Sequence, residues 1–183
     1  MKKHDESGQC PCARCRAIAS GMTPEEADAQ QRDWENRCLV DNGFYVHLVG
    51  QDNGSPTNFN AHTHGLDRFD DHLDFQVIIP LPPEIVHGIL TVLSERVKEG
   101  ERFAPNQLVD KVLTGGVQVK LVEAKEDNRK VLRVILPDPR GKVEPNEINE
   151  QYGTQYADVE GVTLPPKKER PWVPYKVKHG RYS

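Results

Sequence analysis

The sequence predicts an α+β protein with a largely antiparallel sheet of about five strands and helices packed on one face of the sheet. Apolar residues concentrate between Leu39 and Leu136, and both ends of the chain are polar. Within that stretch the expected order is strand, strand, strand, helix, helix, strand, strand. A doubly wound parallel sheet needs regular alternation of strands and helices, so this order favours antiparallel pairing.

The N-terminal segment, residues 1–41, is expected to be helical. Residues 11–20 read as a short first helix that stops at a glycine. Thr23 begins a second helix, because Glu26 stands three positions later and completes a capping box. Asn42-Gly43 is a suitable end for this helix, since glycine readily adopts the left-handed conformation there.

Three extended segments follow. Residues 44–49 and 73–79 alternate apolar and polar side chains, as strands do, and 58–64 is a third strand candidate. The stretch 50–56 is rich in glycine, asparagine and proline and is expected to be a loop.

The second half of the core adds helices and a hairpin. Pro82-Pro83 opens a helix over residues 82–98, with a short helix expected at 106–113 and a hairpin from 117–123 and 130–136. The long helix has an apolar stripe wide enough to pack on a sheet. That stripe comprises Ile85, Val86, Ile89, Leu90, Val92, Leu93 and Val97.

The chain is therefore expected to divide into a cysteine-bearing helical segment (1–41), an α+β core (42–145) and an irregular basic tail (146–183). Its 183 residues carry 24 basic and 28 acidic side chains, a net charge of −4, so nucleic acid is not the expected partner. No stretch has the ~20 apolar residues of a membrane span, and no signal peptide precedes the core, so we expect a cytoplasmic protein.

Histidines and aspartates gather between His62 and Asp74. Because strand side chains alternate, His62, His64, His72 and Asp74 are expected to share one face of the sheet, near His47. The apolar residues Phe59, Phe75 and Val77 would then face the long helix.

Such a wall can bind a metal. Two imidazoles at i and i+2 lie roughly 7 Å apart at the backbone, and their rings can turn toward one ion. With Asp74, or alternatively Asp70 or Asp71, they would form a set of histidine and carboxylate ligands with open positions, which suits zinc or another divalent transition metal. The plainer interpretation is a solvated polar sheet face, and His87 on the long helix is expected to be only solvated.

Cysteines form a second candidate metal site. Cys10, Cys12 and Cys15 lie within six residues, Cys38 follows on the next helix, and His4 is a spare ligand. Together they could hold a structural zinc. The spacing differs from paired C-x-x-C motifs, and Cys38 could instead be a buried apolar residue near Trp34.

Four short segments stand out along the core: Asn60-Ala61-His62-Thr63-His64-Gly65-Leu66, His72-Leu73-Asp74-Phe75-Gln76-Val77, Leu81-Pro82-Pro83-Glu84-Ile85-Val86 and Leu136-Pro137-Asp138-Pro139-Arg140-Gly141. Together they resemble the bacterial domain-of-unknown-function family 4262. The resemblance covers about residues 42–145 and implies the limits of the domain but no activity. The chain departs from the family pattern at His62, where the family has tyrosine, and at His64, where it has an apolar residue.

Two hypotheses about function follow. In the first, the histidine and aspartate face binds a transition metal and supports hydrolytic or oxidative chemistry. In the second, the domain is a non-catalytic module that binds a small-molecule ligand or a partner protein and uses the cysteines for a structural metal. The sequence has no nucleophile elbow, phosphate-binding loop or dinucleotide fingerprint. Nucleotide chemistry is therefore not expected, and catalysis is left open.

Overall fold

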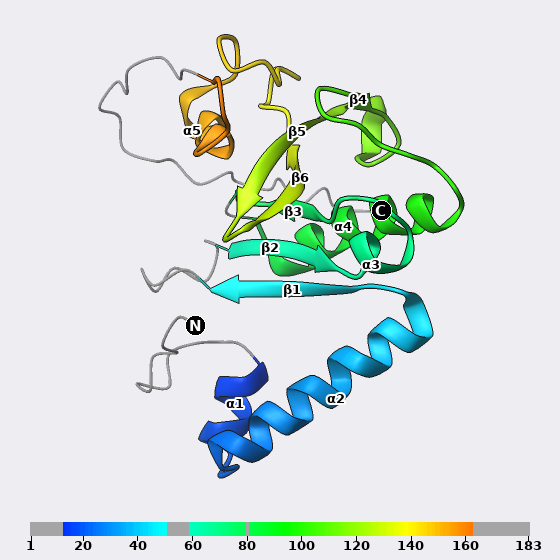
Figure 1. Ribbon diagram of the computed structural model, residues 1–183. Helices are drawn as coiled ribbons and strands as arrows, with labels where there is room; N and C mark the ends of the chain where they lie inside the picture. The colour runs from blue at the N-terminus through cyan, green and yellow to red at the C-terminus, as the bar shows by residue number, and fades with distance from the viewer. Residues whose placement is uncertain (1–12, 51–58, 80, 163–183) are drawn as a thin grey trace, which may run out of the picture.

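The computed structural model describes residues 13–50, 59–79 and 81–162, which form one mixed six-stranded sheet with helices (Figure 1). The strands are β1 (Tyr45–Gly50), β2 (Phe59–His64), β3 (Phe75–Val77), β4 (Leu108–Val109), β5 (Val119–Glu126) and β6 (Arg129–Ile135). The α-helices are α1 (Ala13–Ala19), α2 (Pro24–Asn42), α3 (Leu66–Phe69), α4 (Pro83–Lys98) and α5 (Glu150–Gly153). Two 3₁₀ turns, η1 (Thr114–Gly116) and η2 (Thr154–Tyr156), complete the elements. The α+β class is as predicted.

The sheet has the order β1-β2-β3-β6-β5-β4. Of the pairings between these strands, β3 with β6 is parallel and the other four are antiparallel. The sheet is thus mixed and has one strand more than the five expected. The parallel pair matters for the site, because it brings the β5–β6 hairpin beside β2 and β3.

The extra strand corrects the helix expected at residues 106–113. Leu108 and Val109 instead pair with Lys120 and Val119 of β5. Asn106 has a left-handed backbone (φ 66°), and its N–H donates to the Leu121 carbonyl at 2.7 Å. A residue in that conformation cannot continue a right-handed helix, so the chain turns into an edge strand.

Helices α1 and α2 form an arm that extends away from the sheet below β1 (Figure 1). Thr23 caps α2 as predicted, because its side chain accepts from the Glu26 N–H and the Glu26 carboxylate accepts from the Thr23 N–H. Gly43 ends the helix with φ 78°. Ala27 is the only buried residue of α2, so the arm gains little from packing on the rest of the chain.

Helix α4 packs on one face of the sheet. Its buried residues Val86, Leu90 and Leu93 join Ala61, Phe75 and Val77 of β2 and β3 in the main hydrophobic core. The expectation that Phe75 and Val77 face the long helix is confirmed, whereas the side chain of Phe59 lies outside the described residues. The other face of β1 and β2 is therefore free to carry polar groups.

The C-terminal segment covers the opposite face of β5 and β6. Val122 and Ile135 pack there against Ile148 and Tyr156 in a second, smaller core. Helices thus lie on both faces of the sheet, not on one. Residues 146–162 are not an irregular tail, because they contain α5 and η2, while 163–183 lie outside the described residues.

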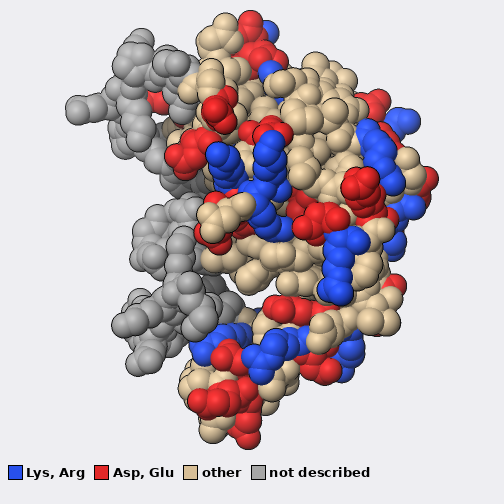
Figure 2. Space-filling model, in the orientation of Figure 1, with Lys and Arg blue, Asp and Glu red and all other residues tan. Residues whose placement is uncertain are grey.

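Acidic and basic side chains are interspersed over the face of the molecule in Figure 2, without a broad basic patch on the residues it colours. Within the described ranges, no helix combines the length and apolarity that crossing a membrane requires.

Candidate functional site

Three histidines meet on the face of the sheet opposite α4. His47 comes from β1 and lies directly across from His62 on β2, while His64, two residues further along β2, lies across from Tyr45. Alternation within each strand sends Val46, Ala61 and Thr63 to the other side. Antiparallel pairing of two short strands is therefore sufficient to bring the three imidazoles together.

The imidazole nitrogens converge. One ring nitrogen from each of His47, His62 and His64 lies within 4.8 Å of the other two. The Nε2 atoms of His62 and His64 are 3.0 Å apart. No other group of three potential metal ligands occurs among the residues that the structure describes. His62 is 5% exposed and the other two rings are half-buried.

Aromatic rings pack along one side of the site. Tyr45 stacks on His64 with ring centroids 4.9 Å apart, and Trp34 of α2 meets Tyr45 edge-on at 5.8 Å. Burial, with a smaller contribution from the Glu35 charge, raises the pKa of Tyr45 to about 12, so its hydroxyl stays protonated at neutral pH. The arm therefore reaches the site through Trp34.

Glu126 approaches the site from the end of β5. Its carboxylate contacts Nδ1 of His62, and both side chains are less than a tenth exposed. Burial alone would raise the pKa of Glu126. The hydrogen bonds to His62 and Arg129 outweigh burial and lower the pKa, so the group is ionised at neutral pH.

Arg129, at the start of β6, joins Glu126 to a second carboxylate. Its guanidinium donates to Glu126 at 2.7 Å, to Asp74 at 2.6 Å and to the Thr63 carbonyl at 3.0 Å. Asp74 also accepts from the Thr63 hydroxyl at 2.8 Å and from the Leu66 N–H at 3.3 Å. Burial raises the pKa of Asp74 to about 6, against the opposing effects of Thr63 and Arg129.

The charge on His64 is also set by its surroundings. Burial lowers the pKa of His64 to about 3, and the nearby positive charge of Arg129 acts in the same direction. His64 is therefore a neutral imidazole at neutral pH, with a lone pair that can bind a cation.

The structure brings together only part of the predicted wall. His62 and His64 lie with His47, but Asp74 is bound by Thr63, Leu66 and Arg129 and reaches His62 only through Arg129 and Glu126. Asp70 and Asp71 precede β3, and neither belongs to the converging group.

His72 lies apart from the wall. The Phe103 N–H donates to its Nε2 at 3.1 Å, so the proton is on Nδ1, which donates to the Leu73 carbonyl at 2.7 Å. Its ring packs against Phe75 and Phe103, both in the core beneath α4. The alternation used to place His72 fails because Asp71 turns the chain with φ 50° and β3 begins only at Phe75.

The predicted cysteine site is only partly within the described residues. Cys10, Cys12 and His4 lie outside them. Cys15 is buried in α1, where its neighbour Arg14 pairs with Asp28. Cys38 lies ten residues beyond Asp28, about 15 Å further along α2. Cys15 and Cys38 are not joined by a disulfide.

Glu126 and Arg129 were not predicted as site residues. The sequence placed Glu126 only near a hairpin turn. Extending the strand to Glu126 and noting its shared face with Val122 would have put it on the side opposite α4. Its position beside His62, however, depends on the parallel pairing of β3 with β6. No spacing in the sequence gives that pairing.

A hollow lies away from the three histidines. It has a volume of about 480 Å³ between β5 and the C-terminal segment and is lined by residues that include Lys120, Val122, Glu144 and Tyr156. None of the three histidines lines it. Lys120 and Glu144 pair there at 2.6 Å.

Comparison with known proteins gives one match. The family model described as Domain of unknown function (DUF4262) matches residues 39–143, more than half of the chain. No curated protein and no solved structure matches the chain. The matched range contains His47, His62, His64, Glu126 and Arg129, whereas most of the α1–α2 arm lies before it.

Proposed function

We propose that this chain, which belongs to the DUF4262 family, a domain of unknown function, binds a divalent transition metal through His47, His62 and His64. Zinc is the first candidate for that metal. Because the family has no assigned function, the proposal rests on the side chains of this chain alone. The observation that carries this proposal is the convergence of one nitrogen from each ring within 4.8 Å of the other two. Imidazole is a common ligand of zinc, copper, iron and nickel.

The spacing suits such an ion. Nitrogens bound to tetrahedral zinc at roughly 2.0–2.1 Å lie about 3.3–3.4 Å from one another. The Nε2 atoms of His62 and His64, 3.0 Å apart, are already close to that value. The His47 nitrogen, within 4.8 Å of the other two, would have to move to the same spacing to complete the set. Three protein ligands leave a fourth position open to water, as in catalytic zinc sites.

The surrounding charge also favours a cation. Glu126 and Asp74 are both buried, and Arg129 is the guanidinium that binds them both. When both carboxylates are ionised, this group carries a net charge of −1 in a region of low polarity. A divalent ion on three neutral imidazoles would more than offset that charge.

Elemental analysis of the purified protein tests the proposal. We expect about one equivalent of zinc, or one equivalent bound on titration with Zn²⁺, and loss of this binding in His47→Ala and in the double variant His62→Ala, His64→Ala. His87→Ala is the matched control, because His87 is exposed on α4 and interacts only with Thr91 among its described contacts.

Absence of stoichiometric metal after titration, or full retention in both histidine variants, would contradict the proposal. The second result would favour a site at the cysteines instead. Circular dichroism of each variant establishes that the fold is intact, and His47→Ala, at a half-buried position, carries the test if the double variant does not fold.

A further inference from the structure

We propose that Glu126 and Arg129 are positioning residues of the histidine site, and that they select the ring form of His62 that presents Nε2 to the metal. This inference rests on the proposed metal binding. It assigns a role to two residues that lie outside the ligand set.

The first step is the contact between Glu126 and His62. Nδ1 of His62 is a buried nitrogen that makes no hydrogen bond of ordinary geometry, and the Glu126 carboxylate is in contact with it. Because Arg129 donates to the other oxygen of this carboxylate, Glu126 acts as an acceptor, and Nδ1 is the atom that carries the proton in this contact. In the neutral ring Nε2 then holds the lone pair, so in the metal-free protein it accepts from the Nε2–H of His64 at 3.0 Å. Glu126 thus orients the electron pair of His62 toward the convergence point.

The second step is the restraint on Glu126 itself. A glutamate at the end of a hairpin has three rotatable bonds, and holding it still costs conformational entropy. Arg129, three residues later, binds one carboxylate oxygen at 2.7 Å, while His62 contacts the other. Because both oxygens are engaged, the carboxylate has a fixed direction.

The third step is the set of contacts that hold Arg129 in place. Its guanidinium also binds Asp74 at 2.6 Å and the Thr63 carbonyl at 3.0 Å. Thr63 stands between His62 and His64 on β2, so the same guanidinium contacts the backbone of the ligand-bearing strand and the carboxylate that orients one ligand. In metal proteins such outer partners commonly change metal affinity 10–100-fold.

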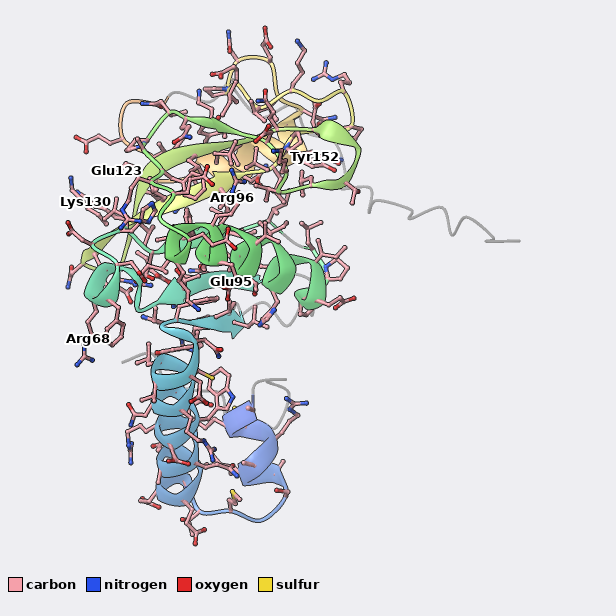
Figure 3. All side chains as sticks on the ribbon, turned by 90° about the vertical axis from the view of Figure 1, so that its right-hand side faces the viewer. Arg68, Glu95, Arg96, Glu123, Lys130 and Tyr152 are labelled. Atoms are coloured by element: carbon pink, nitrogen blue, oxygen red, sulfur yellow. The ribbon has the colours of Figure 1, made fainter. Side chains whose placement is uncertain are left out.

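The test compares glutamates on opposite faces of one strand. Glu126→Ala removes the acceptor, and Glu126→Gln keeps an oxygen of the same reach but loses the charge. Glu123→Gln is the control, since Glu123 is an exposed residue of β5 that pairs with Lys130 at 2.8 Å, and Figure 3 shows these two side chains together at the outer side of the hairpin. Zinc affinity is measured by competition with a chromophoric chelator.

We expect Glu126→Ala to weaken zinc binding about 10–100-fold, Glu126→Gln to weaken it less, and Glu123→Gln to leave it unchanged. Arg129→Met should weaken binding in the same direction, while Lys130→Met, its neighbour on β6, should not. If Glu126→Ala does not fold, Glu126→Gln, which has the same shape, carries the comparison.

Nitrogen NMR of the zinc-free protein at pH 8 gives an independent measure. In the wild type His62 should carry its proton on Nδ1, and in Glu126→Ala the two ring forms should mix. Unchanged zinc affinity together with an unchanged ring form in Glu126→Ala would overturn the inference. A wild type that binds no zinc but shows the expected ring forms would instead overturn the metal proposal and keep the positioning role.

Discussion

Neighbouring residues of β2 belong to two regions that satisfy their polar groups in different ways. Thr63 faces a closed network, in which its hydroxyl donates to Asp74 and accepts from the Phe75 N–H, and Asp74 is bound by Arg129. His62 and His64 face the other side, where imidazole nitrogens converge with those of His47. The first region is completed by the protein itself, whereas the second has the form of a ligand set.

The closed network connects β2, the start of α3 and the residue before β3 through Thr63, Leu66 and Asp74. Gly65, between Thr63 and Leu66, has a φ of 118°, which suits glycine, and a Cβ there would lie 2.4 Å from the Gly43 carbonyl oxygen. His62 and His64 lie on the other face of β2, outside this network. The comparison therefore separates a structural connection, which fastens β2 to β3, from a group of imidazoles on the opposite face of the same strand.

The largest expected effect falls on the closed network. Asp74→Ala leaves Arg129, the Thr63 hydroxyl and the Leu66 N–H without their buried partner. Breaking a buried pair in this way costs about 3 kcal/mol or more of the free energy of unfolding. Urea denaturation of the zinc-free protein should show this loss. Glu123→Ala, which breaks an exposed pair, should change stability little.

Zinc should stabilise the protein through the other region. At 100 times its Kd, an ion that binds only the folded state raises the free energy of unfolding by about 2.7 kcal/mol. We expect that rise in the wild type and in His87→Ala, but not in His47→Ala, when unfolding in zinc is compared with unfolding in a chelator. An equal rise in His47→Ala would place the ion away from the histidines.

His72 gives a smaller effect that depends on pH. Burial lowers its pKa in the folded protein, and the Phe103 N–H occupies the nitrogen that would take up the proton. As the pH falls below about 6.5, the unfolded chain therefore binds a proton that the folded protein excludes, and stability falls. The stabilising contribution is present above this pH and is lost as the solution is acidified.

Comparison with His72→Gln isolates that contribution, since glutamine keeps an acceptor for the Phe103 N–H but does not titrate. Between pH 7 and pH 5, the free energy of unfolding of the wild type should fall relative to that of the variant, by at most about 1.4 kcal/mol per pH unit. A difference that stays constant over this range would show that His72 takes up its proton equally in both states.

Much of the fold could be predicted because its signals are local. The capping box at Thr23, the proline start and apolar stripe of α4 and the alternation in β1 and β2 each depend on residues a few positions apart. The prediction was wrong at residues 106–113, where the left-handed Asn106 and pairing with β5 produce a strand that a two-residue apolar signal does not reveal.

The site, like the fold, was predictable only where it depends on residues a few positions apart. Alternation placed His62 and His64 on one face near His47, and the pairing of β1 with β2 brings them together. Glu126 and Arg129 reach this region through contacts between residues 55 to 66 positions apart, which follow from the parallel β3–β6 pair. His72 was assigned to the wrong surroundings because the turn at Asp71 breaks the alternation before β3 begins, and Asp74 is engaged by Thr63, Leu66 and Arg129 instead of by the histidines.

The smallest effect is the sharpest test of the comparison. His64→Val replaces the imidazole with an apolar side chain, and His64 is neutral at neutral pH because burial and the charge of Arg129 lower its pKa to about 3. Removal of a half-buried neutral ring should change the free energy of unfolding of the zinc-free protein by no more than about 1 kcal/mol. The response to zinc should be lost, because two imidazoles remain. If zinc-free His64→Val were instead destabilised as much as Asp74→Ala, the histidines would belong to the structural connection, and the two sides of β2 would form one region.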